Sequence, residues 1–208
     1  MTDAGSGRVG AVTSAVARQV RELRAARGWS FEELAGRSGV SKGMLVQIEA
    51  ARTNPSIGTL CRVADAFGVT IAELLEPAER SSVRITATVD APVLWRGTHG
   101  GTARLLNGLG GPDLVELWEW RLEPDEAHHS ADHARGTREI LHVLAGTLAV
   151  TVAGVDHDVP AGHTIEFPAD REHGYRATGE EPVRLVMVVV TPSGEWDRRT
   201  RSREPRPS

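Results

Sequence analysis

The sequence lacks several features that would place it in common protein classes. Of its 208 residues only Cys61 is a cysteine, so no disulfide can form within the chain and a cysteine-based zinc site is excluded. No apolar run approaches the roughly 20 residues that a membrane-spanning helix needs, and the N-terminus lacks the charged-then-apolar layout of a signal peptide. These absences predict a cytoplasmic protein with no membrane partner.

Acidic residues are scarce early in the chain and abundant later. The formal net charge is −4, which by itself disfavours nucleic-acid binding. From Arg8 to Arg62, however, nine basic residues stand against four glutamates, whereas residues 81–190 hold nine arginines against sixteen acids. This asymmetry predicts two domains with different partners, of which the first suits a phosphate backbone.

Residues 11–76 have the apolar period of helices. Apolar residues recur at three- and four-residue steps from Val12 to Leu23, and Gly28 ends that helix. Ser30 and Glu33 are spaced as a capping box at the start of a second helix. Capping and stop residues predict helices over 30–37, 41–50, 56–67 and 70–75. The segment therefore predicts a compact all-α domain of five helices, preceded by a flexible, glycine-rich arm at residues 1–10.

After Pro77 the pattern changes to short β-rich segments separated by turns. Predicted strands cover 83–89, 114–122, 139–144, 147–152, 163–167 and 183–191. Residues 77–81 are interpreted as a linker, residues 82–192 as an antiparallel sandwich or barrel, and residues 193–208 as a disordered tail. The predicted fold class is α+β in two domains.

The second and third predicted helices have the spacing of a helix-turn-helix. Gly39 lies at the turn, and the exposed face of the following helix carries Lys42 and Gln47, which can donate to acceptors on base edges. A helical protein-interaction module is the alternative interpretation. The predicted DNA contacts are Ser41, Lys42, Gly43, Met44, Gln47, Arg52, Thr53 and Asn54.

The helical domain resembles the lambda-repressor-like, XRE-type helix-turn-helix family. The matching sequence segments are Arg21-Glu22-Leu23-Arg24, Glu33-Leu34-Ala35, Gly39-Val40-Ser41, Ile48-Glu49 and Arg52-Thr53-Asn54-Pro55-Ser56. The resemblance implies operator binding. Family members often carry a phosphate-holding Gln at the start of the second helix, where this chain has Phe31.

The histidine-rich second half resembles a cupin, the small double-stranded β-helix barrel. His133 precedes Glu139, and Gly146 follows Glu139 by seven residues, as in the first cupin motif. The second motif reads Pro160-Ala161-Gly162-His163, then Phe167-Pro168 and His173. Three departures are Arg135 in place of a ligand histidine, Gly162-His163 in place of the usual Gly-Asp, and Ala177 in place of an asparagine.

The resemblance implies a metal site, for which three candidate ligands remain: His133, Glu139 and His173. Arg135 at the missing position would put a positive charge beside a cation, so we expect no bound metal and no cofactor. A divalent transition metal stays the alternative. Since neighbouring strand residues face opposite ways, at most one of His128 and His129 points inward. The predicted effector pocket comprises His133, Arg135, Glu139, His173, Trp118, Trp120 and Tyr175.

Together the two resemblances imply a sequence-specific transcriptional regulator without catalytic residues. Its partners would be operator DNA, a small-molecule effector in the cupin domain and a second copy of the chain, because one helix-turn-helix reads one half-site. Two alternatives stay open. One is a metal-dependent cupin dioxygenase or isomerase fused to a DNA-binding domain, and the other is a barrel that only dimerises.

Overall fold

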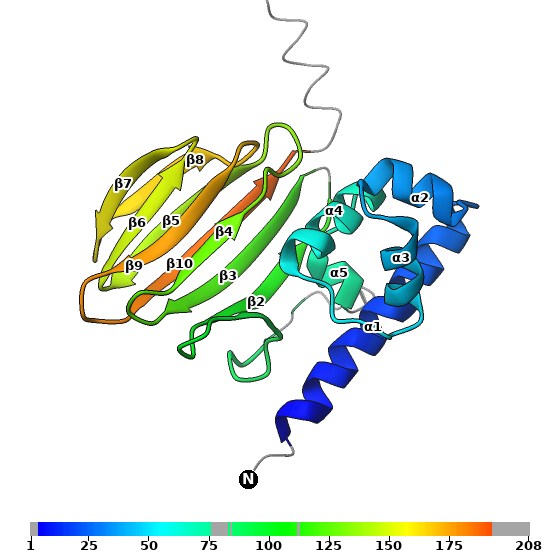
Figure 1. The fold of residues 1–208 in the computed structure, drawn as a ribbon, viewed down its shortest axis with the longest axis horizontal. Helices are drawn as coiled ribbons and strands as arrows, with labels where there is room; N and C mark the ends of the chain where they lie inside the picture. The colour runs from blue at the N-terminus through cyan, green and yellow to red at the C-terminus, as the bar shows by residue number, and fades with distance from the viewer. Residues whose placement is uncertain (1–3, 76–82, 84, 112, 193–208) are drawn as a thin grey trace, which may run out of the picture.

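The computed structural model describes residues 4–75, 83, 85–111 and 113–192. Figure 1 shows the helices gathered on one side of the β-sheets, with α4 and α5 nearest to the sheets. The helices are α1 (Ala4–Ala26), α2 (Phe31–Ser38), α3 (Lys42–Glu49), α4 (Ile57–Phe67) and α5 (Ile71–Leu75). Within the described residues this is the predicted all-α domain of five helices, at nearly the predicted bounds except at the start of α1.

Capping side chains fix the boundaries of these helices. Ser30 accepts a hydrogen bond from the backbone N–H of Glu33, whose carboxylate accepts from the Ser30 backbone, so the predicted capping box is confirmed. Ser41 and Ser56 cap α3 and α4 in the same way. Gly68 ends α4 at φ 64°, a left-handed conformation that favours glycine.

The N-terminal arm differs from the prediction. Helix α1 begins at Ala4, so a flexible arm is wrong for residues 4–10, and residues 1–3 lie outside the described residues. Glycine lowers helix propensity by only about 1 kcal/mol per residue, which does not end a helix that continues into a well-packed segment. Val16 and Val20 supply that packing, since both are buried in the core.

The β domain consists of two antiparallel sheets. The larger has the order β1-β2-β3-β10-β5-β8, and the smaller has the order β4-β9-β6-β7. The strands are β1 (Val93–Arg96), β2 (Thr102–Leu109), β3 (Leu114–Leu122), β4 (Ala127–Ser130), β5 (Arg138–Ala145), β6 (Thr147–Val152), β7 (Val155–Pro160), β8 (Thr164–Pro168), β9 (His173–Thr178) and β10 (Val183–Thr191). Five of these match predicted strands, and β1, β2, β4, β7 and β9 were not predicted.

The predicted strand at 83–89 is wrong for the described part of that segment. Residues 85–87 have no regular structure, and 87–91 close into turns in which Asp90 and Ala91 donate to the carbonyls of Ala87 and Thr88. Ile85 is 93% exposed, so it does not pack against a core as the alternating pattern of this segment predicted. Residues 77–81 and 193–208, predicted as linker and tail, lie outside the described residues.

The apolar core runs without interruption from the helices into the sheets. Leu60, Val63 and Phe67 of α4 belong to the same cluster of buried side chains as Trp118 and Trp120 of β3. Helix α5 contacts β2 directly. The two domains therefore pack against each other through a continuous interface, and the candidate site lies at that interface.

Candidate functional site

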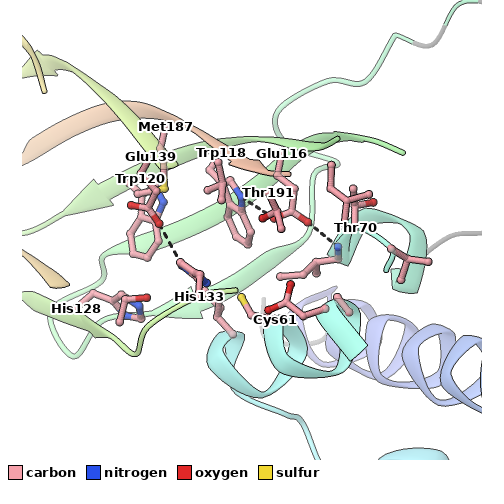
Figure 2. Close-up of a pocket in the computed structure, with 18 of the residues that line it drawn as sticks. Cys61, Thr70, Glu116, Trp118, Trp120, His128, His133, Glu139, Met187 and Thr191 are labelled. Carbon is pink, nitrogen blue, oxygen red and sulfur yellow. Dashed lines mark hydrogen bonds and ion pairs between the residues drawn. The ribbon is translucent and has the colours of Figure 1, made fainter. Parts of the chain in front are cut away.

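A cavity lies where the helical domain meets the β domain, and side chains from both domains line it (Figure 2). The helical domain contributes Ile57, Cys61, Ala64, Asp65, Val69, Thr70 and Ile71. The β domain contributes Leu114, Glu116, Trp118, Trp120, His128, Ser130, His133, Glu139, Tyr175, Met187, Val189 and Thr191. None of these lining residues is lysine or arginine.

Two imidazoles converge on one carboxylate at the inner end of the cavity. Glu139 of β5 is 1% exposed, and its Oε1 lies 3.2 Å from Nε2 of His133 and 3.4 Å from Nε2 of His173. One ligand atom from each of the three residues lies within 4.8 Å of the others. The structure thus brings together the three residues that the cupin resemblance implied as ligands.

The hydrogen bonds of His173 fix which of its nitrogens is free. Its Nδ1 lies 2.7 Å from the carbonyl oxygen of Arg171, which can only accept, so Nδ1 carries the proton. Its Nε2 is buried and has no hydrogen-bond partner among the described residues. A histidine anchored through Nδ1 with a free Nε2 lone pair is typical of metal ligands, so this donor set fits a divalent transition metal.

Tyr175 of β9 completes the surroundings of the carboxylate by donating its hydroxyl proton to Glu139 Oε2. Burial alone would raise the pKa of Glu139, but its interactions with the imidazoles of His133 and His173 lower it to about 2. Burial likewise lowers the pKa of His133, whereas its interactions with Cys61 and Glu139 raise it to about 11. His133 and Glu139 therefore form an ion pair.

Glu116 of β3 occupies the end of the cavity next to α5. Its Oε1 accepts a hydrogen bond of 2.6 Å from the backbone N–H of Ile71, and its Oε2 accepts one of 3.2 Å from Trp118 Nε1. Burial raises the pKa of Glu116 to about 7, although both hydrogen bonds act in the opposite direction. Sequence analysis assigned no role to Glu116.

Cys61 of α4 faces the cavity from the helical domain. It lines the cavity together with His133, and Figure 2 shows its sulfur beside the imidazole. Burial raises the pKa of the Cys61 thiol. Sequence analysis used this residue only to exclude disulfides, because nothing local to an apolar helix face signals a contact with a histidine 72 positions later.

His128 of β4 points inward and His129 points outward, as strand alternation predicted. The His128 ring stacks at 8° on Tyr175 and lies 4.9 Å from the Trp120 ring. Burial lowers the pKa of His128 to about 4, which keeps the ring neutral. His129 instead lies 3.2 Å from the exposed carboxylate of Glu172.

The predicted pocket residues are mostly gathered at one place. Trp118, Trp120, His133, Glu139 and Tyr175 line the cavity, and His173 lies directly behind Glu139.

Arg135 differs from the other predicted pocket residues. It is exposed and does not line the cavity. The chain turns at this point, since Thr137 N–H donates to the Ala134 carbonyl and Gly136 has φ 86°. Strand alternation therefore does not carry Arg135 inward. The expectation of a metal-free site rested on its charge, and its position removes that reason.

The second candidate surface is the exposed face of α3. Lys42, Gly43 and Gln47 are exposed, and Met44 is 40% exposed. An added Cβ on Gly43 would meet no atom within 4 Å, so packing within the chain does not require this glycine. The other predicted DNA contacts, Ser41, Arg52, Thr53 and Asn54, flank α3; Thr53 is half-buried and the rest are exposed.

Internal contacts hold α3 in place. Arg24 of α1 donates to both carboxylate oxygens of Glu49, at 2.6 and 2.9 Å, and Glu49 is 5% exposed. The Arg24 guanidinium also lies 4.2 Å from the centre of the Phe31 ring. Phe31, the position that departs from the family resemblance, therefore packs under an arginine. Lys42 forms an ion pair with the exposed Glu32 of α2.

Comparison with known proteins identifies both domains. A family model described as a helix-turn-helix domain matches residues 15–76, and one described as a cupin domain matches residues 118–189. An uncharacterized HTH-type transcriptional regulator of Sinorhizobium fredii, y4dJ, is 39% identical over 59 residues, which cover 28% of this chain and 77% of that protein. The chain belongs to the HTH-type transcriptional regulators.

Two similar proteins extend over both domains. The HTH-type transcriptional regulator SutR of Escherichia coli is 26% identical over 173 residues, covering 83% of this chain and 93% of that protein. The crystal structure of an HTH_3 family transcriptional regulator from Vibrio cholerae has a TM-score of 0.70 at 28% identity, covering 88% and 99% of the two chains. The regulator described here is thus a DNA-binding protein with a cupin domain. No helix in its described residues has the length and apolar character needed to cross a membrane.

Proposed function

We propose that this regulator binds a small-molecule effector in the cavity and that the bound effector changes its affinity for operator DNA. The observation that carries the proposal is a concave site with unpaired polar groups, in a chain that also has an exposed recognition helix. Trp120 is 3% exposed, and its indole N–H has no partner among the described residues, as is also true of His173 Nε2. A ligand with an acceptor would satisfy the indole, and a metal ion held by His133, Glu139 and His173 would satisfy the imidazole.

The regulator acts by binding and not by catalysis. The relatives that support this carry the names of transcriptional regulators. The second candidate is a metal-dependent cupin enzyme, which the His133, Glu139 and His173 cluster favours. Turnover of an identified effector by the purified, metal-loaded protein would favour the enzyme, and recovery of the unchanged effector would favour the regulator.

On the DNA-binding surface, Lys42 and Gln47 contact base edges in the major groove. Their exposure on α3 supports this role, as does the freedom of Lys42 to exchange its solvent-exposed ion pair with Glu32 for a base or phosphate. Gly43 and Met44 allow close approach of the helix to the groove. Ser41, Arg52, Thr53 and Asn54 contact the phosphate backbone.

His133, Glu139 and His173 would hold a divalent transition metal. Such an ion would act as a Lewis acid that binds an oxygen or nitrogen of the effector. The fit rests on the free Nε2 of His173 and on the convergence of both imidazoles on Glu139 Oε1. Tyr175 would orient the carboxylate by its hydrogen bond to the other oxygen.

The regulator forms a homodimer through the outer face of its larger sheet. Val188 of β10 pairs with Leu117 of β3 on one side and with Ile140 of β5 on the other, so three apolar side chains adjoin across three strands. Leu117 is 38% and Ile140 is 40% exposed, which is high for leucine and isoleucine in a sheet centre. A second copy covering this face would present two recognition helices to two half-sites.

Sedimentation analysis tests the dimer. We expect Ile140→Glu to give monomers, because a charge in the covered face has no partner there. Val155→Glu is the matched control, since Val155 is 57% exposed on β7 of the other sheet. Monomers of the native chain, or dimers of both variants, would contradict this interface.

A screen for compounds that raise the melting temperature tests the effector proposal. We expect that a stabilising compound also shifts the affinity for an operator fragment selected from random DNA, and that Trp120→Phe weakens the response by removing the indole donor. Stabilising compounds that all leave operator affinity unchanged would contradict it.

A further inference from the structure

We propose that the DNA-binding domain is itself one wall of the effector site, so that the occupant of the cavity controls how this domain docks on the cupin domain of the same chain. This inference rests on the proposed effector function and adds the route by which an effector acts. The wall is the face of α4 that carries Cys61 and Asp65, together with the start of α5 at Thr70 and Ile71.

The contact between Cys61 and His133 joins this wall to the polar centre of the cavity. His133 and Cys61 both line the cavity, and His133 Nε2 lies 3.2 Å from Glu139 Oε1. Figure 2 shows Cys61 and Glu139 on different sides of the imidazole. Any occupant that moves the His133 ring therefore moves a partner of α4, with no intervening element.

The interface beside the cavity is built for close approach. Gly108 of β2 faces α5, and a Cβ built on it would lie 2.5 Å from Cβ of Ala72 and 3.1 Å from Oγ1 of Thr70. Ala72 cannot yield by rotating a side chain, so a larger residue at position 108 would push α5 away. The 2.6 Å hydrogen bond from Ile71 to Glu116 is made at the same place and needs the docked position of α5.

Helix α4 is also part of the framework of the helix-turn-helix. On its opposite face, Leu60, Val63 and Phe67 are buried in the core of the DNA-binding domain. Helix α4 contacts α2, and α2 contacts the recognition helix α3. A displacement of α4 by an occupant is thus a displacement of the whole DNA-binding domain, because that domain packs as one body on this helix.

The docked arrangement sets the operator geometry. In a dimer formed through the cupin domains, two docked DNA-binding domains hold their recognition helices at a fixed separation, which a two-half-site operator requires. When the DNA-binding domains undock, their recognition helices are no longer held at a fixed separation. The effective concentration of the second recognition helix at its half-site then falls. An occupant that pushes α4 outward therefore weakens operator binding, and one that bridges both walls strengthens it.

Cys61 allows a direct test because it is the sole cysteine of the chain. The control variant C61S/R62C moves the thiol to the neighbouring position, since Arg62 lies next to Cys61 on the exposed side of α4. We expect N-ethylmaleimide to alkylate Cys61 of the native protein at least about 10-fold more slowly than the relocated thiol of the control. G108V should speed alkylation at position 61 and leave position 62 unchanged. The shared wall would be overturned if Cys61 of the native protein and the relocated thiol of C61S/R62C were alkylated at equal rates. It would also be overturned if Cys61 were alkylated at the same rate in G108V as in the native protein.

The adduct then serves as a covalent occupant of known position. Alkylated native protein should bind a two-half-site operator about 10-fold more weakly than unmodified protein, whereas the same reagent should not change the operator affinity of C61S or of C61S/R62C. Methyl methanethiosulfonate gives a smaller, methylthio adduct, which should weaken operator binding less. The two modified proteins should have the same melting temperature. Unchanged operator affinity of the alkylated, folded protein would overturn the proposal.

The effector function and the shared wall can be contradicted independently of each other. A small molecule that shifts operator affinity, in a chain whose Cys61 adduct has no effect, would overturn the shared site and keep the effector function. An adduct that weakens operator binding, in a chain that no stabilising compound affects, would support the shared wall and overturn the effector function.

Discussion

The carboxylate of Glu116 in β3 accepts a hydrogen bond of 2.6 Å from the backbone N–H of Ile71 in α5. This bond joins the two domains at the edge of the cavity, where the rest of the interface is largely apolar. The first backbone N–H groups of a helix have no partner within the helix, so a carboxylate supplied by the other domain satisfies one of them. Glu116 thereby links the docking of the DNA-binding domain to a carboxylate that lines the cavity.

Replacing Glu116 should weaken the docking of the two domains. Glu116→Leu leaves the Ile71 N–H without an acceptor, and we expect a loss of about 1–3 kcal/mol in the free energy of unfolding. Glu116→Gln keeps an acceptor oxygen of the same size and should lose much less. Denaturant unfolding of the three proteins at pH 6 measures the difference, and a Leu variant as stable as the Gln variant would show that the bond is not part of the docked interface.

Glu116 also predicts a pH dependence of stability. Its pKa is raised to about 7 in the folded protein from the ordinary value of 4.5. Because the folded state holds the proton more tightly than the unfolded state, the contribution of Glu116 is greatest below pH 4.5 and declines as pH rises to about 7. Relative to native protein, Glu116→Gln should therefore gain stability between pH 5 and 7.5. A constant difference between the two unfolding curves over this range would contradict the raised pKa.

The recognition helix predicts separable effects on DNA binding. Lys42→Ala and Gln47→Ala should each weaken specific operator binding by about 1–3 kcal/mol while leaving the melting temperature unchanged, because both side chains are exposed. Glu32→Ala should strengthen binding modestly, since it releases Lys42 from its ion pair and removes a negative charge near the phosphates. Gel-shift titration checks all three, and native-like binding by both Lys42→Ala and Gln47→Ala would show that another surface reads the operator.

The imidazole–carboxylate cluster predicts a capacity for metal. Chelator-treated protein titrated with Ni²⁺ should bind one ion per chain, with higher affinity at higher pH because the ion displaces the proton of His133. His173→Ala should lose this binding, whereas His129→Ala, an exposed histidine on a neighbouring strand, should keep it. Calorimetry gives the stoichiometry. Native protein that binds no ion, or that binds equally well without His173, would contradict the assignment of these ligands.

Local signals predicted the helical domain well. Ser30, Ser41 and Ser56 each offer a side-chain oxygen to a backbone N–H three residues later, and such caps depend on adjacent residues alone. The β-branched run around Ile85 shows the limit of the same reasoning. Its alternation suits a strand, but a strand needs a neighbouring strand, and the turns at 87–91 separate this segment from the sheets.

The site was predictable only in part. Trp118 and Trp120, which were predicted for the effector pocket, both line the cavity. The turn at Gly136 breaks the alternation and leaves Arg135 exposed, which no strand pattern anticipates. The contribution of Cys61 depends on docking between domains, and the residues that permit docking carry no pattern of their own in the sequence.

The most direct test of the account is the reciprocal linkage between effector and operator. Once a stabilising compound is identified, its affinity is measured by calorimetry with and without a saturating selected operator, on native protein and on Trp120→Phe. If the compound changes operator affinity by a factor of about 5–150, thermodynamics requires the operator to change compound affinity by the same factor. We predict equal factors for native protein and a reduced factor for Trp120→Phe; a compound whose affinity is the same with and without operator would contradict the account.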